Sequence, residues 1–253
     1  MTKSHPPLIQ LRDTDPMPQV DLAWGPDSVA PGLLAVGGGL TVPRLIEAYS
    51  QACFPWYSDD QPVIWWSTDP RMILSINEFR FHRSLRKQLK QLISKNQIEI
   101  RVDHDFAKII KHCSQAHRKD QTGTWIVRDM IQAYEKLHQA GFAHSVETWI
   151  NGELQGGLYF VSIGKAVFGE SMFALQANAS KLALAALICM CKVEQVSMID
   201  CQQNTRHLAS LGAKPVSRQA FLGHVNKAKN AGPVDWNFEP IYWNEIMLEP
   251  PQT

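Results

Sequence analysis

The sequence predicts an α+β fold with a mixed, mainly antiparallel sheet. Three stretches that read as strands, 143–150, 154–163 and 166–173, are separated by the turn signals Asn151-Gly152 and Gly164-Lys165. This pattern is typical of consecutive antiparallel strands joined by tight hairpins. The chain has 253 residues, of which 45% are hydrophobic and 19% are charged. It can therefore bury a sizeable core, and disordered or collagen-like classes are excluded.

The N-terminal part is predicted to begin as an irregular segment and then to form one short helix. Residues 1–30 are rich in Pro and Asp, which favours loops. Thr41 is a suitable N-cap, and Pro43 falls in the first turn, where its missing N–H is tolerated. The preceding run Gly37-Gly38-Gly39 lacks the third glycine of a dinucleotide-binding motif, since residue 42 is Val. We expect these glycines to turn the backbone.

An aromatic cluster closes the N-terminal part. It consists of Phe54-Pro55-Trp56-Tyr57 and Val63-Ile64-Trp65-Trp66. Rings this dense predict an aromatic-lined pocket or a packed interface, although most of them are also expected to pack in the core. We predict a small N-terminal α/β domain over residues 1–70 and a larger domain over residues 71–253.

Charge is distributed unevenly although the formal net charge is only +1. Residues 1–70 carry three basic and eight acidic side chains, whereas residues 71–120 carry twelve and five. Residues 79–98 contain no acid, and their cations recur at helical spacing on a different face from three leucines: Arg80, Arg83, Arg86, Lys87, Lys90 and Lys95, with Leu85, Leu89 and Leu92. Such a basic amphipathic helix suits a polyanion such as a nucleic acid. An ordinary solvated helix face explains the pattern about equally well.

The remaining elements are predicted from caps and periodicity. Before the three strands we expect a strand at 97–102, a helix capped by Asp103 or Asp105, and a helix at 128–140 that ends at Gly141. After them we expect a long helix capped by Asn178 or Ser180, a strand at 197–202, a short helix at 208–211 and a last helix at 218–229. An antiparallel meander, a crossover helix and a further strand are the core order of the GNAT acetyltransferases. Residues 71–253 are therefore predicted to form a GNAT-like domain.

No segment is predicted to enter a membrane or to direct secretion. The longest apolar run, residues 182–191, is about half the length of a membrane-spanning helix, and the N-terminus lacks an apolar signal core. The five cysteines are an odd set without a CxxC pair, which fits reduced thiols. We expect a soluble cytoplasmic protein.

The strand at 197–202 ends in two candidate functional groups. Side chains alternate along a strand, so Asp200 and Gln202 are expected to share one face. They stand at the end of a central strand, where open sheets bind ligands. A capping Asp beside a surface Gln explains the same spacing.

Glu170 is the third polar candidate. It lies within an apolar strand between Phe168 and Met172, and carboxylates are rarely buried unless they are paired, so a cleft is predicted there. Facing Asp200, it would form an anionic pocket for a cation. An ion pair with Arg128 or Arg206 is the competing interpretation.

Other chemistries have weaker support. His104, His112, Cys113 and His117 are close in sequence, but a helix separates His112 from Cys113 by roughly 100°, so a metal site is not expected. No GxSxG motif is present. None of the fifteen glycines follows a Gln or Arg by three residues, as the pyrophosphate loop of acetyl-CoA enzymes requires. We expect no cofactor.

Eight blocks of the sequence, taken in order from about Pro31 to Arg218, closely resemble the leucyl/phenylalanyl-tRNA–protein transferases. The blocks are residues 31–38, 54–57, 65–71, 123–126, 144–147, 169–173, 199–202 and 207–213. The resemblance implies a small N-terminal domain followed by a GNAT-like domain. It also implies an enzyme that moves Leu, Phe or sometimes Met from aminoacyl-tRNA to an N-terminal Arg or Lys, marking proteins for degradation by the N-degron pathway.

The resemblance also implies roles for individual residues. The polar catalytic centre corresponds to Asp200, Gln202 and Glu170. Aromatic and apolar residues matching the substrate pocket are Trp56, Trp125, Tyr49, Leu158, Met172 and Ile199. Acceptor-stem phosphates would contact the basic helix through Arg83, Arg86, Lys87 and Lys90.

In the mechanism that we expect, the side-chain oxygen of Gln202, oriented by Asp200, accepts an N–H of the attacking α-amine. Glu170, together with Asp200, binds the cation of the acceptor residue. Two other functions stay open: a coenzyme-A-dependent N-acetyltransferase, suggested by fold order, and a non-catalytic RNA-binding protein, suggested by the basic segment.

Overall fold

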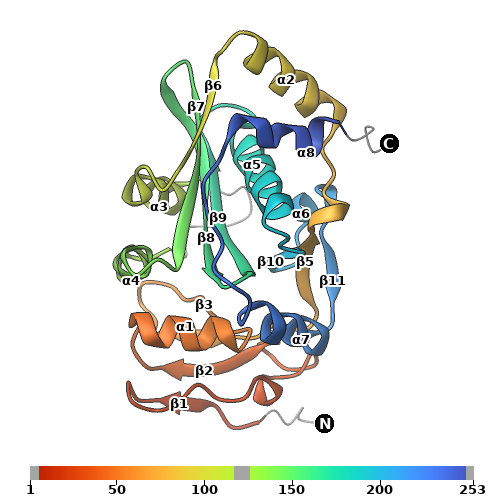
Figure 1. Ribbon diagram of the computed structural model, residues 1–253. Helices are drawn as coiled ribbons and strands as arrows, with labels where there is room; N and C mark the ends of the chain where they lie inside the picture. Colours follow the sequence, from red (N-terminus) through yellow and green to blue (C-terminus); the bar gives the residue numbers. More distant parts are fainter. Residues whose placement is uncertain (1–5, 117–125, 249–253) are drawn as a thin grey trace.

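Two β-sheets organise the chain in a computed structural model, which describes residues 6–116 and 126–248. The larger sheet has seven strands in the order β11-β5-β10-β9-β8-β7-β6 (Figure 1). Its strands are β5 (Arg71–Ser75), β6 (Ile98–Val102), β7 (Ala143–Ile150), β8 (Glu153–Ile163), β9 (Ala166–Ala174), β10 (Met198–Gln202) and β11 (Lys214–Val216). The smaller sheet has four strands in the order β1-β2-β4-β3: β1 (Ile9–Leu11), β2 (Leu33–Gly37), β3 (Phe54–Pro55) and β4 (Ile64–Trp66).

The predicted mixed, mainly antiparallel sheet is confirmed. Every neighbouring pair in the larger sheet is antiparallel except β9 and β10, which run parallel. The hairpin between β7 and β8 turns at Asn151 and Gly152, whose φ angles of 53° and 79° are both positive, as a type I′ turn requires. The connection from β9 to β10 runs through helix α5 (Ala179–Val193), the expected crossover.

Helices cover both faces of the larger sheet. On one face lie α5, α2 (Arg83–Ser94) and α8 (Asn244–Met247), which share a core with Leu158 and Ile199. The other face carries α1 (Val42–Ser50), α3 (Phe106–Gln115), α4 (Arg128–Gln139) and α7 (Arg218–Ala228). The short elements are α6 (Arg206–Ser210), η1 (Val20–Leu22), η2 (Ile76–Glu78) and η3 (Pro240–Trp243).

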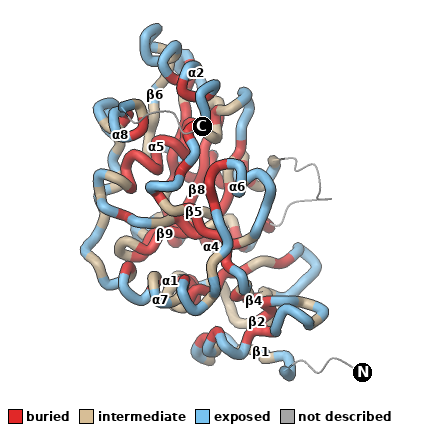
Figure 2. Tube along the Cα trace, turned by 90° about the vertical axis from the view of Figure 1, so that its right-hand side faces the viewer, coloured by how far each residue is buried: buried red, intermediate tan, exposed pale blue. Residues whose placement is uncertain are grey.

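The apolar run at 182–191 is the buried centre of α5. All of its residues are buried, which explains why this helix has no polar stripe. Figure 2 shows this burial beside the exposed outer turns of α2. Among the described residues, no helix is long and apolar enough to cross a membrane. All five cysteines are free, as the odd set predicted.

Local signals place several helix starts correctly. The side chains of Thr41 and Asp105 cap α1 and α3 by accepting from the amides of the third residue along, Arg44 and Lys108. Asn178 precedes α5 in a left-handed conformation, but its side chain makes no capping bond. The backbone also turns at Gly37 and Gly38, as expected, with a positive φ at both glycines.

Several short elements were not predicted. Strands β1, β2, β5 and β11 have three to five residues each and, unlike residues 97–102, no sustained alternation of polar and apolar residues. Strand β1 lies within the segment predicted to be irregular and is ordered by parallel pairing with β2. The chain passes from the smaller sheet to the larger one between Trp66, the end of β4, and Arg71, the start of β5. The division into domains at residue 70 stays a prediction.

Candidate functional site

The candidate site lies where the two parallel strands β9 and β10 stop pairing. Their backbones pair at Val167 with Ile199 and at Phe168 with Asp200, and the pairing ends there. If the pairing of β9 with β10 continued in the same register, Glu170 would lie opposite Gln202. A side-chain bond takes the place of the backbone pairing, since Nε2 of Gln202 donates to Oε1 of Glu170 at 2.8 Å.

Bulges on both strands direct these side chains. Glu170 is an extra residue in the pairing of β9 with β8, and Cys201 is an extra residue in the pairing of β10 with β5. Gln202 itself has a φ of 58°. Bulges re-aim neighbouring side chains, and they break the strict alternation on which the predicted common face of Asp200 and Gln202 depended.

Glu170 is held by three neutral donors. Its side chain accepts hydrogen bonds from Tyr49 Oη at 2.7 Å, from Tyr134 Oη at 3.3 Å and from the amide of Gln202. Only 8% of the residue is exposed. Burial therefore raises the pKa of Glu170 to about 8, with the charge of Asp200 adding to the rise and the tyrosine hydroxyls opposing it. Among the described residues Glu170 has no ion-pair partner, so neither Arg128 nor Arg206 plays that role.

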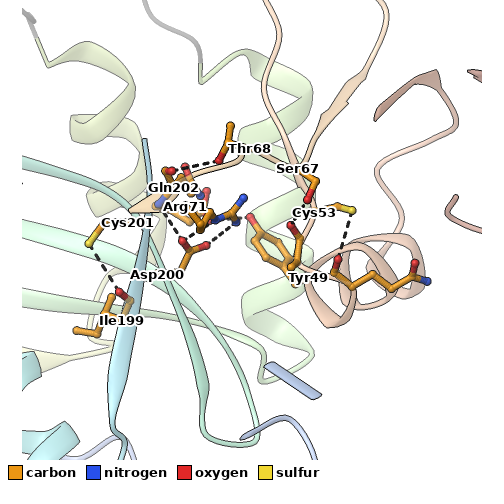
Figure 3. A network of polar contacts seen from close by, with 12 residues as sticks. Tyr49, Cys53, Ser67, Thr68, Arg71, Ile199, Asp200, Cys201 and Gln202 are labelled. Atoms are coloured by element: carbon orange, nitrogen blue, oxygen red, sulfur yellow. Dashed lines mark hydrogen bonds and ion pairs between the residues drawn. The ribbon is translucent and has the colours of Figure 1, made fainter. Parts of the chain in front are cut away.

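Asp200 is paired with an arginine that the sequence analysis did not identify. The guanidinium of Arg71 contacts both carboxylate oxygens, Nε to Oδ1 at 2.8 Å and Nη2 to Oδ2 at 2.6 Å (Figure 3). Both residues are at most 1% exposed, and Arg71 also lies against the rings of Phe54 and Phe221, at 4.6 and 4.9 Å. The predicted anionic pair of Glu170 and Asp200 is therefore corrected: the charge of Asp200 is compensated by Arg71.

The expected control of the Gln202 side chain by Asp200 is also corrected. Oδ1 of Asp200 accepts the backbone N–H of Gln202 at 2.9 Å, so Asp200 fixes the main chain at this turn. The side-chain amide is held by Glu170 instead. Thr68 adds a hydrogen bond of 3.3 Å to the carbonyl oxygen of Gln202 (Figure 3). Because Glu170 accepts from the amide nitrogen, the amide oxygen is left to accept from a ligand.

A cavity of about 1160 Å³ opens at this point. Glu170 and Gln202 line it together with four of the residues predicted for the aminoacyl pocket, Trp56, Leu158, Met172 and Ile199. Tyr49 is fully buried and lies behind Glu170, where it acts through a hydrogen bond and not as a wall. Trp125 lies outside the described residues.

Further walls of the cavity were not predicted. They include Leu74, Leu184 and Leu187 on the α5 side of the sheet, and Phe54 and Phe173 on the other side. The wall is therefore mainly apolar, with convergent polar groups at the strand ends, as expected for a site that takes an apolar group and acts on its polar end. Tyr134, on α4, is the other functional neighbour that the sequence analysis missed, since nothing in its helical spacing sets it apart.

The basic helix α2 divides into exposed and buried cations. Arg83, Lys87 and Lys90 are exposed and available to a polyanion. Arg86 differs from the prediction: it is 9% exposed, donates to the carbonyl oxygen of Met247 at 2.8 Å, and lies 5.4 Å from the ring centre of Phe81. Its position on α2 turns it toward the C-terminal segment, so it is a packing residue in this structure.

The described histidines near α3, His104 and His112, belong to no cluster of potential metal ligands. Within the described residues, no group of three His, Cys, Asp or Glu side chains converges. His112 stacks on Phe173 with a centroid distance of 4.7 Å and lines the cavity. Burial, followed by Lys108 and Lys111, lowers the pKa of His112. His117 lies outside the described residues.

Two family models match the chain. The model described as leucyl/phenylalanyl-tRNA protein transferase matches residues 73–226, and that of the N-terminal domain of the same protein matches residues 38–69. A leucyl/phenylalanyl-tRNA–protein transferase of a Polaromonas species is 52% identical over 247 residues, which cover 98% of this chain and 97% of the relative. Its counterpart in Paraburkholderia xenovorans is 53% identical over 233 residues, 92% of this chain and 95% of the relative.

Solved structures similar to the chain include N-acetyltransferases. A ribosomal-protein-alanine N-acetyltransferase from Brucella melitensis is 16% identical with a TM-score of 0.32, covering 56% of this chain and 96% of that one. A GCN5-related N-acetyltransferase from Kribbella flavida is 8% identical with a TM-score of 0.35, covering 67% and 58%. Likeness at these scores adds nothing to the assignment of the site.

Proposed function

The chain belongs to the leucyl/phenylalanyl-tRNA–protein transferase family, and from this premise we propose how its cavity carries out the reaction. The enzyme transfers Leu or Phe from aminoacyl-tRNA to the N-terminal Arg or Lys of a protein. The donor is an activated ester, so the α-amine of the acceptor attacks its carbonyl carbon without ATP or coenzyme A. A C–N bond forms, the C–O bond to the terminal ribose breaks, and the amine loses a proton while the tRNA hydroxyl gains one.

One observation supports this proposal above the others: Gln202 lines the mainly apolar cavity while Glu170 holds its amide nitrogen, which leaves the amide oxygen as the acceptor for a ligand. An N–H of the acceptor amine donates to this oxygen, which directs the nitrogen lone pair toward the ester carbonyl. An amide is too weak a base to remove the proton. Positioning of the amine therefore supplies the larger share of the rate, and the proton leaves through water or the vicinal ribose hydroxyl.

Asp200 and Arg71 support Gln202 from behind. Their ion pair is sealed from water, and Asp200 fixes the backbone N–H of Gln202 in its left-handed turn. Both act as positioning residues in the proposed mechanism. Removing either charge would leave the other one buried without compensation, which is costly.

Glu170 supplies the negative charge for the acceptor side chain. With a pKa of about 8, its carboxyl is largely protonated near neutral pH in the free protein. A guanidinium or ammonium group arriving beside it favours the ionised form, because an opposite charge lowers the pKa of a carboxyl group. A neutral N-terminal residue provides no such compensation, which accounts for the preference for Arg and Lys.

The apolar end of the cavity receives the aminoacyl side chain. Leu158, Met172 and Ile199 line it with Leu184 and Leu187 of α5. Charged aminoacyl side chains are excluded from this apolar end by the cost of removing them from water. One methylene discriminates by only about 1–3 kcal/mol, so a pocket that takes Leu and Phe also takes Met to some extent.

The exposed cations of α2 hold the acceptor stem through its phosphates. Arg83, Lys87 and Lys90 are exposed, and contacts to phosphates carry no sequence information, so this contact contributes affinity without sequence preference. We place the reaction in the cytoplasm, where charged tRNA is available.

One experiment tests the proposal against the two other functions. The protein is incubated with an Arg-initiated peptide and either radiolabelled Phe-tRNA or radiolabelled acetyl-CoA, and peptide-bound label is counted. We expect label from Phe-tRNA alone, and the same peptide with an N-terminal Ala should remain unlabelled. Label from acetyl-CoA would indicate an N-acetyltransferase, and label from neither donor would indicate an RNA-binding protein.

A further inference from the structure

The backbone at Gln202 forms a strained turn. Its φ of 58° is positive, and across it the N–H of Gln203 donates to the carbonyl oxygen of Cys201 at 2.7 Å. A hydrogen bond between residues i and i+2 around a residue with positive φ forms the γ-turn that is rare and strained in proteins. Such a conformation persists only where neighbouring groups hold it. Gln202 therefore needs anchors on both of its peptide groups.

Both anchors come from the segment of residues 67–71, which leads from β4 into β5. Thr68 Oγ1 donates to the carbonyl oxygen of Gln202 at 3.3 Å (Figure 3). At the end of the segment, Arg71 holds the carboxylate of Asp200 with two hydrogen bonds. Asp200 in turn accepts the backbone N–H of Gln202. The position of this segment therefore controls the orientation of the peptide groups on either side of Gln202.

Helix α7 holds the segment through its first residue, Arg218. Nη1 of Arg218 donates to the carbonyl oxygen of Ser67 at 2.8 Å, and its backbone N–H donates to Oδ1 of Asp69 at 3.1 Å. The pairing of β11 with β5 places Arg218 there, since Val216, two residues before it, pairs with Arg71. One residue thus binds the segment at two points, through its side chain and through its main chain.

The N-terminal part of the chain also binds the start of this segment. The backbone N–H of Ser67 donates to the carbonyl oxygen of Gly32 at 2.8 Å, and its hydroxyl donates to that of Ala52 at 3.2 Å. Gly32 packs closely there, because a Cβ at this residue would lie 2.9 Å from Cα of Thr68. These contacts do not involve Arg218. Without the Arg218 side chain the segment is expected to stay attached to the smaller sheet but to shift relative to β10.

We propose that Arg218 is a positioning residue for Gln202, which it holds in place through the segment 67–71. This inference rests on the proposed function, in which Gln202 directs the acceptor amine. Arg218 is not among the described residues that line the cavity, so it acts through Gln202 and not on the substrates. A displacement of about 1 Å at a reacting group can lower a rate by roughly 100-fold, so a smaller shift of Gln202 is sufficient for about tenfold.

The test is single-turnover transfer of Phe from Phe-tRNA to an Arg-initiated peptide by Arg218→Met, which keeps a long side chain and removes its donors. The transfer rate should fall by roughly tenfold, with a dissociation constant for Phe-tRNA within about twofold of the wild type. Arg218→Lys keeps a cation that can donate to the carbonyl of Ser67, so it should lose no more than about threefold. Gln219→Ala, a change of an exposed neighbour on α7, should transfer at the wild-type rate.

A double-mutant cycle separates positioning of Gln202 from a merely structural role. In the Gln202→Ala protein, adding Arg218→Met should lower the transfer rate by less than about twofold, because no side-chain amide is left to position. An equal fall in both backgrounds would overturn the proposal. An unchanged transfer rate in Arg218→Met, or a loss of Phe-tRNA affinity in place of a loss of rate, would overturn it as well.

Thr68 provides a second pair of variants, which tests the same connection if Arg218→Met does not fold. Thr68→Val keeps the shape of the side chain and removes its hydroxyl, whereas Thr68→Ser keeps the hydroxyl. Thr68→Val should slow transfer several-fold and Thr68→Ser should not, and equal rates in the two variants would overturn the connection between the segment and Gln202. A wild-type protein that transfers no Phe, or a Gln202→Ala protein with the wild-type rate, would instead overturn the proposed function.

Discussion

Replacing Glu170 by Gln changes one buried charge without changing the volume of the side chain. In the folded protein the pKa of Glu170 is raised to about 8 by burial, whereas in the unfolded chain it is about 4.3. Between these values the folded state binds a proton that the unfolded state releases. The contribution of Glu170 to stability is therefore fully present below about pH 4 and is lost as the pH rises toward 8.

The magnitude follows from the width of that window. A single proton changes the free energy of unfolding by at most about 1.4 kcal/mol per pH unit. The free energy of unfolding of Glu170→Gln minus that of the wild type should therefore be about 2 kcal/mol larger at pH 7.5 than at pH 5.5. A constant offset from altered hydrogen bonds does not affect this slope, because Tyr49, Tyr134 and the amide of Gln202 do not titrate in this range.

Guanidinium unfolding at both pH values, with Glu153→Gln as the control, measures this gain. Glu153 is exposed on β8, so its replacement removes the same charge without a buried pKa. Transfer should fall in Glu170→Gln by roughly 100-fold, because the new amide cannot ionise to bind the guanidinium or ammonium group of the acceptor. Parallel stability curves for wild type and Glu170→Gln would refute a protonated Glu170 in the folded protein.

Three further predictions concern the ion pair, the pocket and the basic helix. Arg71→Met alone should destabilise the protein by about 3–5 kcal/mol in urea unfolding, and adding Asp200→Asn should recover part of that loss; fully additive losses would contradict a compensated pair. Leu158→Phe should narrow the pocket and lower kcat/KM for Phe transfer roughly tenfold relative to Leu transfer; an unchanged ratio would remove Leu158 from the pocket wall. Lys87→Ala should lower the log–log salt slope of tRNA binding by about one at unchanged Tm, whereas Arg86→Ala should lower Tm at an unchanged slope; the opposite pattern would reverse the two assignments.

The central strands could be predicted because their signals are local. The hairpin at Asn151 and Gly152 depends on residues that tolerate positive φ, and it joins two long strands, β7 and β8, of eight and eleven residues. Strands β1, β2, β5 and β11 could not be predicted in this way. Strand β5 begins with the buried charge of Arg71, and its neighbours β10 and β11 come from distant parts of the chain.

The residues of the site could be predicted better than their partners. Glu170 was assigned to a cleft because a carboxylate within an apolar strand needs one, and it does line the cavity. The partner of Asp200 lies 129 residues away in the sequence, beyond the reach of spacing arguments, although Arg71 ends one of the blocks that resemble the family. The bulge at Cys201 has no sequence signal, so the change of side-chain direction at Gln202 required the structure.

Arg86 is a further residue whose tertiary partners could not be predicted from the sequence. Its helical spacing matches that of Lys87 and Lys90, and charge alone groups the three together. The carbonyl of Met247 and the ring of Phe81, which take Arg86 out of the exposed set, come from separate elements. Helical periodicity gives a position on a face, but the tertiary contacts decide which cations remain free for a phosphate.

The central claim is that Gln202, held by Glu170, positions the acceptor amine for attack on the aminoacyl ester. Its most direct test is single-turnover transfer of Phe from Phe-tRNA to an Arg-initiated peptide by Gln202→Ala, with Phe-tRNA affinity measured in parallel. We predict a transfer rate lower by roughly 100-fold and a dissociation constant within about threefold of the wild type. A wild-type transfer rate in Gln202→Ala would contradict the account.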